Sequence, residues 1–100
     1  MSKRETYCRA DVAGEVAARF QVSHALASEI VDFSIEAIQA ALEAGLRVEF
    51  RTFGTFEFRR RRARVGRNPL YPERGEVEIP ERTEIVFRPS KELAQKVKDL

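Results

Sequence analysis

Arginine is concentrated in one stretch of the chain, from Arg59 to Arg74, which contains seven arginines, one glutamate and no lysine. The flat guanidinium group of arginine can donate two parallel hydrogen bonds to a phosphate, whereas the ammonium group of lysine acts as a point charge. The positive charge is also local, because residues 1–50 carry a formal charge of −3 and residues 51–100 carry +5. This pattern is typical of a polyanion-binding element on a near-neutral body. The alternative is a solvated strand edge protected by charge, which would not require arginine in particular.

The other reactive residues do not form a catalytic or metal-binding set. Cys8 is the only cysteine and His24 is the only histidine, so the sequence offers no nucleophile with a partner base and no spaced group of metal ligands. A glycine-rich phosphate loop is also missing. We therefore expect no enzyme activity, no metal and no cofactor. A single cysteine cannot close an internal disulfide, which favours the cytoplasm, and no apolar run approaches the ~20 residues of a membrane span.

Two helices are predicted before the basic stretch, and residues 1–8 are expected to form a loose leader. Apolar residues at helical spacing predict the first helix over Arg9–Phe20. The second helix is predicted over Ser23–Ala44, with Ser23 as its N-cap and Gly45 as its stop. This long helix has two apolar stripes on different faces: Leu26, Ile30, Phe33 and Ala37 form one, and Val31, Ile35, Ile38 and Leu42 form the other.

Two apolar stripes on one helix indicate a dimer. An ordinary surface helix buries a single stripe against its own chain, and only two further short helices and a small sheet are available to cover the second. We therefore expect one stripe to face the chain's own elements and the other to face a second subunit. The alternative is the central helix of a monomeric bundle.

The second half predicts a small antiparallel sheet that extends into an arm. Residues 47–51 alternate as a strand, residues 52–54 form a connection around Gly54, and Phe56 and Phe58 continue on one face of the next strand. Past Phe58 no apolar face remains, so the chain should leave the body as a two-stranded β-ribbon over residues 59–80. Residues 83–88 then return to the sheet, and residues 91–100 form a last helix after Pro89 and Ser90.

Two motifs resemble those of a known family. Phe53-Gly54-Thr55-Phe56-Glu57 and Gly66-Arg67-Asn68-Pro69 stand at the spacing that the bacterial HU and integration host factor family uses between body strand and arm tip. The resemblance extends from about Ala10 to Leu100. It implies a single α+β domain over residues 1–100 that forms an intertwined dimer, with two N-terminal helices, a three-stranded antiparallel sheet extended into a β-ribbon arm, and a short C-terminal helix.

The resemblance also implies roles for individual residues. Pro69 matches the arm-tip proline that wedges between base pairs, with Arg67 and Asn68 beside it in the groove, and Lys91 matches a phosphate contact. The resemblance also matches Arg59, Arg61 and Arg64 to arm positions that follow the DNA backbone or groove. With Arg60 and Arg62 added, the expected DNA-binding residues are Arg59, Arg60, Arg61, Arg62, Arg64, Arg67, Asn68, Pro69 and Lys91. Adding the helix stripes to the matching phenylalanines, the expected dimer core contains Leu26, Ile30, Phe33, Ile38, Leu42, Phe53, Phe56 and Phe87.

The sequence departs from the family pattern at several positions. Thr52 stands where the family usually has glycine, Arg60 stands where many members have an acid, and the arm tip between Leu70 and Val77 is about two residues longer than usual. The turn at Thr52 can therefore differ from that of relatives, and the additional arginine favours tighter DNA binding.

These observations predict a non-enzymatic architectural protein of the cytoplasm and nucleoid. It is expected to bind the minor groove of double-stranded DNA as a dimer, and to bend or compact the duplex with low sequence specificity. A homodimer is expected, and a heterodimer is the alternative. Two other functions stay open: a sequence-preferring subunit like integration host factor, and a dimeric assembly module whose basic arm binds RNA or an acidic protein.

Overall fold

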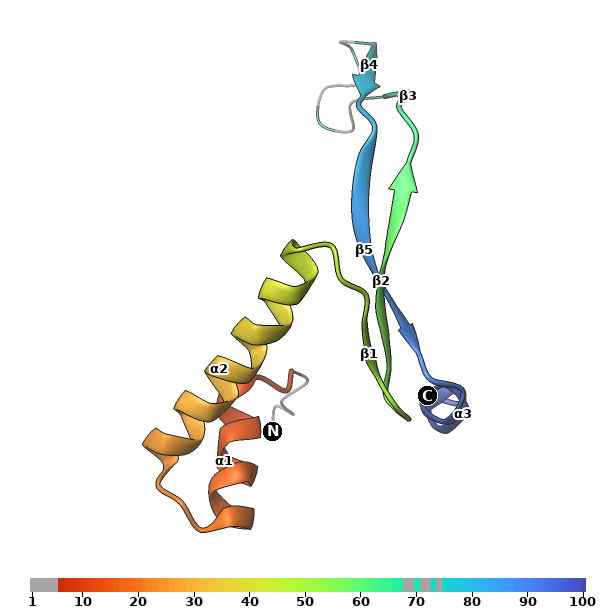
Figure 1. Cartoon of the computed structure of the whole chain (residues 1–100). Coiled ribbons are helices and arrows are strands. Elements are labelled where there is room, and N and C mark those ends of the chain that lie inside the picture. Colours follow the sequence, from red (N-terminus) through yellow and green to blue (C-terminus); the bar gives the residue numbers. More distant parts are fainter. Residues whose placement is uncertain (1–5, 68–69, 71–72, 74) are drawn as a thin grey trace. The chain divides into compact units, whose positions relative to one another are not determined.

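The computed structural model describes residues 6–67, 70, 73 and 75–100. The chain divides into two compact units, Met1–Gly45 and Leu46–Leu100, and each is considered by itself. The expected α+β order of two helices, an antiparallel sheet and a short final helix is confirmed (Figure 1). The first unit contains α1 (Arg9–Phe20) and α2 (His24–Glu43), and the second contains β1 (Val48–Phe50), β2 (Gly54–Arg61), β3 (Arg64–Arg67), β4 (Glu76–Ile79), β5 (Arg82–Pro89) and α3 (Lys91–Val97).

Helix α1 begins at a cap that includes the lone cysteine. The backbone N–H of Cys8 donates to Oδ2 of Asp11 at 2.7 Å, and Sγ of Cys8 lies 3.1 Å from the same oxygen. An acidic residue in the first turn also suits the positive end of the helix dipole. Cys8, at the end of the expected leader, is therefore part of the structure that starts α1, whereas residues 1–5 of that leader lie outside the described residues.

The two helices pack through one of the two predicted stripes of α2. The buried core of the first unit contains Ala13 from α1 with Ala27 and Val31 from α2, and Ile35 packs against it. The other stripe is exposed in the single chain: Leu26 is 44 %, Ile30 is 45 % and Phe33 is 70 % exposed. Within the first unit, only one apolar face of α2 is thus covered.

The sheet has the order β1-β2-β5, with both pairs antiparallel. Strand β1 covers only the start of β2, from Gly54 to Phe56, while β2 stays paired with β5 as far as Arg61 opposite Arg82. Beyond β1 the sheet therefore continues as a two-stranded ribbon (Figure 1). This is the ribbon that the loss of apolar alternation after Phe58 predicts.

Strands β3 and β4 continue this ribbon in an unchanged register. Arg61 pairs with Arg82, and three residues further along each strand Arg64 pairs with Ile79. No residue is inserted on either strand, so the interruption over residues 62–63 and 80–81 is not a bulge. Pro80 has no N–H to donate to the ladder. The expected return strand over residues 76–80 accordingly ends at Ile79.

The last helix begins beside the turn between β1 and β2. Ser90 Oγ accepts from the N–H of Leu93 at 3.0 Å, which confirms Ser90 as the N-cap of α3, and donates to the carbonyl of Thr52 at 2.7 Å. The N–H of Ser90 also donates to the carbonyl of Phe53 at 2.9 Å. Helix α3 ends at Val97, earlier than the predicted Leu100. In the described part of the chain, no helix has the length and apolar character needed to cross a membrane.

Candidate nucleic-acid interface

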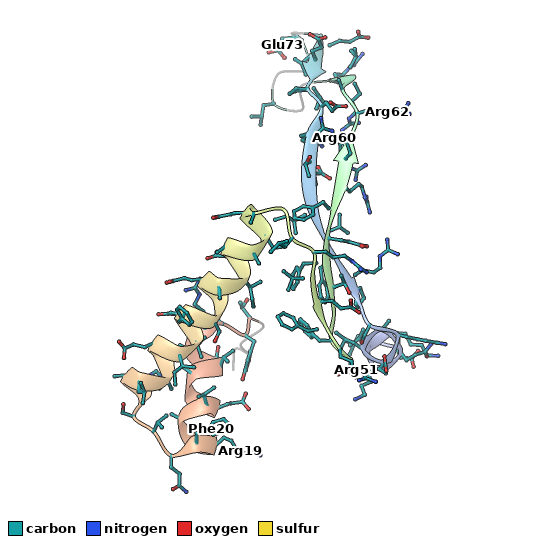
Figure 2. All side chains as sticks on the ribbon, in the orientation of Figure 1. Arg19, Phe20, Arg51, Arg60, Arg62 and Glu73 are labelled. Atoms are coloured by element: carbon teal, nitrogen blue, oxygen red, sulfur yellow. The ribbon has the colours of Figure 1, made fainter. Side chains whose placement is uncertain are left out.

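The predicted basic residues form an exposed series along the ribbon. Arg59, Arg60 and Arg61 lie on β2, Arg62 lies in the interruption, and Arg64 and Arg67 lie on β3. Figure 2 shows Arg60 and Arg62 on the part of the ribbon that runs beyond β1. Lys91 is exposed on the first turn of α3. Asn68 and Pro69 lie outside the described residues.

The ribbon has two faces of different character because side chains alternate along a strand. On one face Phe56 and Phe58 are opposite Phe87 and Ile85, and Arg60 follows opposite Thr83. The other face is charged along most of its length: its charged members are Glu57, Arg59 and Arg61 on β2 with Arg82, Glu84 and Arg88 on β5, and Thr55 and Val86 complete it. The apolar face thus extends one pair past the part of β2 that β1 covers, to Phe58 opposite Ile85, and becomes polar at Arg60 opposite Thr83.

Two of the predicted arginines are held by acidic residues of the returning strand. Arg60 forms an ion pair with Glu81 and donates from Nη1 to Oγ1 of Thr83 at 3.0 Å. Arg61 donates from Nε to Oε1 of Glu84 at 2.9 Å, and Arg82 donates from Nε to Oε2 of Glu84 at 3.0 Å. The hydrogen bond from Arg61 is the main reason that the pKa of Glu84 lies below its ordinary value, and the charge of Arg82 adds to it.

The other predicted arginines are not paired in this way. Among the described residues, none of Arg59, Arg62, Arg64 and Arg67 forms an ion pair with a carboxylate. Their guanidinium groups can therefore meet an external anion without first breaking an internal bond. Arg60 and Arg61 instead contribute their charge from positions fixed by Glu81 and Glu84.

Arg82 belongs to this site although the sequence did not predict it. It lies on β5 directly opposite Arg61, and Arg61, Arg62, Arg64 and Arg82 together line a cavity of about 340 Å³. In the sequence Arg82 stands between Glu81 and Thr83, with Glu84 close by, so it does not belong to a run of positive charge. Only the strand register, which places it opposite Arg61, could have identified it.

The aromatic residues expected at the dimer core come together on the body sheet. The ring centroids of Phe53 and Phe87 lie 5.3 Å apart, and those of Phe56 and Phe87 lie 5.0 Å apart. Phe53 and Phe87 nevertheless remain exposed in the single chain. On α2, Leu26, Ile30 and Phe33 are exposed, and Ile38 and Leu42 are half-buried. Each unit thus leaves an apolar face open.

No metal centre accompanies the basic ribbon. Within residues 6–67, 70, 73 and 75–100, no group of three or more His, Cys, Asp or Glu side chains is arranged to hold a metal ion. Glu81 and Glu84 of the ribbon are paired with arginines, as described above. The arrangement can bind an anion by charge and hydrogen bonding.

Comparison with known proteins gives consistent matches over nearly the whole chain. A family model described as "Bacterial DNA-binding protein" matches residues 7–98. The DNA-binding protein HU-1 of Halalkalibacterium halodurans is 40 % identical over 89 residues, covering 89 % of this chain and 97 % of the relative. The β subunit of integration host factor from Neisseria meningitidis is 38 % identical over 100 residues, covering 97 % and 91 %. Among solved structures, Anabaena HU in a cocrystal with DNA matches with a TM-score of 0.79 at 31 % identity, covering 91 % of this chain and 97 % of that one.

Proposed function

Because the chain belongs to the HU and integration host factor family of bacterial DNA-binding proteins, we propose that it is an architectural protein that binds the minor groove as a dimer and bends duplex DNA with low sequence specificity. The family consists of non-enzymatic DNA-binding proteins. The observation that carries the proposal is the two-stranded ribbon that leaves the body sheet with exposed arginines that have no carboxylate partner among the described residues. A DNA-binding protein of this kind acts in the cytoplasm, on the nucleoid.

The arm binds the duplex through shape and charge. The arginines that face the nucleic acid are those without a carboxylate partner among the described residues: Arg59, Arg62, Arg64 and Arg67. A narrow minor groove concentrates negative potential and attracts arginine side chains. Phosphate contacts and groove contacts of this type carry little information on base sequence. The protein should therefore prefer DNA that bends easily over DNA of one particular sequence.

Pro69 supplies the wedge at the arm tip. A proline ring is rigid and apolar and has no N–H, so it can enter a base step without burying an unsatisfied donor. HU and integration host factor are established examples of minor-groove proteins that use apolar wedges, and this step of the mechanism is taken from the family. Unstacking the step bends the duplex and lets more of the protein meet the backbone.

A second copy of the chain covers the apolar faces that a single copy leaves open. The exposed stripe of Leu26, Ile30 and Phe33 on α2 and the cluster of Phe53, Phe56 and Phe87 on the sheet are the surfaces that we assign to the dimer. Exposed apolar surface of this kind marks an association site in a folded protein. A dimer would also provide two arms for one duplex.

Salt dependence tests the binding mode. If each dimer neutralises roughly six to ten phosphates, the logarithm of the affinity should fall with the logarithm of the salt concentration, with a slope of about −0.9 per contact. Fluorescence anisotropy with a random-sequence duplex between 50 and 300 mM salt measures this slope. Binding that does not change with salt would contradict the proposal. Competition by RNA or by an acidic protein that equals competition by duplex DNA would favour an assembly module instead.

The roles of wedge and arm can be separated by mutation. Pro69→Ala should reduce bending more than affinity, whereas Arg59→Ala with Arg64→Ala should reduce affinity on every sequence. Neither arginine forms an ion pair with a carboxylate of the described residues, so their removal leaves the internal ion pairs of the ribbon intact. Energy transfer across an end-labelled duplex reports bending, and titration reports affinity. Equal loss of both properties in both variants would show that the assigned roles are wrong.

One observation favours a second candidate. The similarity to the β subunit of integration host factor covers 97 % of this chain, whereas the similarity to HU-1 covers 89 % of it. The chain could on that basis pair with a different subunit and prefer certain DNA sequences. The mass of the purified protein in solution, with binding to random and to selected duplexes, distinguishes the two candidates. A stable homodimer with equal binding to both pools supports the first.

A further inference from the structure

Four positively charged side chains of the described residues line one cavity of the ribbon, the arginine cavity: Arg61, Arg62, Arg64 and Arg82. It lies where the ladder of the ribbon is interrupted, between the last pair of β2 with β5 and the first pair of β3 with β4. Its lining contains no carboxylate. Four guanidinium groups around one space repel one another, and an anion that enters the space lowers this repulsion.

Glu84 fixes two of these arginines from outside the lining. One of its oxygens accepts from Nε of Arg61 at 2.9 Å, and the other accepts from Nε of Arg82 at 3.0 Å and lies 2.9 Å from Nη2 of Arg82. A carboxylate that binds one edge of a guanidinium group leaves the other edge oriented and available. Arg61 and Arg82 are therefore held in place before any ligand arrives, which lowers the entropy cost of binding.

One donor of this cluster has no acceptor. Nη1 of Arg82 is buried from solvent and makes no hydrogen bond. A buried N–H without a partner is unfavourable, and a charged one more so, so such a group in a folded protein calls for an explanation. Arg82 also lines the cavity, so a small rotation of its guanidinium group that brings Nη1 to the cavity surface would let a ligand oxygen satisfy this donor.

We propose that the arginine cavity is a binding site for one phosphate-type oxyanion, in which Arg82 is the central donor and Arg62 and Arg64 close around the ligand. Arginine is suited to this ligand because its planar fork matches the geometry of phosphate oxygens. Arg62 and Arg64 have no carboxylate partner among the described residues and can turn toward the anion. The source of the phosphate is a backbone phosphate of bound DNA, an assignment that rests on the proposed function, whereas the anion chemistry of the cavity does not.

The first experiment tests the site without DNA. Inorganic pyrophosphate is titrated into the full-length protein, and the Nε–Hε signals of the arginines are followed by NMR at constant ionic strength. Saturable shifts are expected for Arg61 and Arg82, weakened in Arg82→Lys, which keeps the charge but loses the fork, and in Arg62→Gln, which breaks no ion pair. The control is Arg88→Gln, which removes one charge from β5 outside the cavity lining and should leave the shifts unchanged. Shifts that are absent, or that all three variants weaken alike, would overturn the proposal.

The second experiment identifies the source by a double-mutant cycle on DNA affinity. If Arg62 and Arg82 hold the same backbone phosphate, Arg62→Gln lowers the salt slope by about 0.9, and the double variant with Arg82→Lys loses less affinity than the two single losses combined. Arg62→Gln with Arg88→Gln should instead be additive. Pyrophosphate binding with unchanged DNA affinity in Arg82→Lys supports the site and assigns it to a free phosphate compound. If the wild-type protein does not bind DNA, the proposed function fails while the NMR titration still decides on the cavity.

Discussion

Arg61 and Arg82 lie directly opposite each other on the antiparallel ladder of β2 and β5. Like charges at directly opposed positions destabilise a sheet, yet here each guanidinium group donates to one oxygen of Glu84. The carboxylate two residues along β5 converts a repulsive pair into a bridged one. Strand β2 has no apolar residue beyond Phe58, and this part of the ribbon is therefore held in register partly by this single acid.

Replacing Glu84 should loosen the ribbon. Glu84→Gln removes the shared acceptor and leaves the opposed arginines to repel each other, so amide protection should fall for residues 59–61 and 82–84 while it persists near Phe56. The matched control is Glu81→Gln, because the partner of Glu81, Arg60, is opposite Thr83 and not opposite another cation. Hydrogen exchange followed by NMR measures both variants. An equal loss of protection in both would mean that the opposed pair is not the cause.

The same bridge should make the ribbon sensitive to acid. The pKa of Glu84 in the folded protein lies below its ordinary value of 4.5, chiefly because of the hydrogen bond from Arg61. A carboxyl group with a lowered folded pKa stabilises the structure fully above its unfolded pKa and loses that contribution as the pH falls through the folded value. Ribbon protection should therefore stay constant from pH 7 to about 5 and decline below the ordinary carboxyl range. In Glu84→Gln this decline should be weaker, and an identical decline in wild type and variant would contradict the assignment.

Two glycines should respond in opposite directions to alanine. A Cβ on Gly54 would lie 2.7 Å from the carbonyl oxygen of Arg88 and 2.7 Å from the ring of Phe87, whereas a Cβ on Gly14 would meet nothing within 4 Å. Gly54→Ala should thus lower the free energy of unfolding by about 2–3 kcal/mol, typical of an overpacked site. Gly14→Ala, inside α1, should raise it by about 0.5–1 kcal/mol. Urea unfolding measures both, and a stable Gly54→Ala variant would show that the strands can separate at this point.

The elements that depend on local pattern were predictable from the sequence. Ser23 and Ser90 are the N-caps of α2 and α3. Oγ of Ser23 accepts from the N–H of Leu26 at 3.1 Å, and Oγ of Ser90 accepts from the N–H of Leu93 at 3.0 Å. The two stripes of α2 are also present, and the structure shows which one the chain covers itself. These features follow from helical period and capping chemistry within one segment, and they need no knowledge of the partner element.

The features that the sequence did not reveal depend on register. The cavity needs Arg82 opposite Arg61, and the charge pattern around Arg82 alone gives no indication of that pairing. The bridge that Glu84 forms between Arg61 and Arg82 also depends on this register. The end of β4 at Ile79 could have been found locally, because the missing N–H of Pro80 forbids a ladder bond. Cys8 was overlooked as a cap because cysteine is not among the usual N-cap residues, although Asp11 three residues later was a visible signal.

The turn before β2 contains a residue that glycine should improve. Thr52 has φ of 65°, a left-handed conformation that costs an L-residue about 1–2 kcal/mol, and its β-branched side chain fits there poorly. Thr52→Gly should raise the free energy of unfolding by roughly 0.5–1 kcal/mol after the entropy of glycine is deducted. Thr52→Ala keeps the Cβ and should bring no gain, so a comparable gain in Thr52→Ala would assign the effect to the lost hydroxyl.

The exposed stripe of α2 can be tested against an equally exposed phenylalanine elsewhere. Phe33 is 70 % exposed on α2 and Phe20 is 66 % exposed at the end of α1, so a glutamate at either position should fold without disturbing the core of the single chain. If the α2 stripe is the dimer surface, Phe33→Glu buries an unpaired charge in the interface and should shift the dimer to monomer, with a dissociation constant raised by at least 100-fold, as expected for a loss of about 3 kcal/mol. Phe20→Glu should leave the mass unchanged. Sedimentation velocity over a range of concentrations measures both, and dissociation by Phe20→Glu alone would move the interface from α2 to α1.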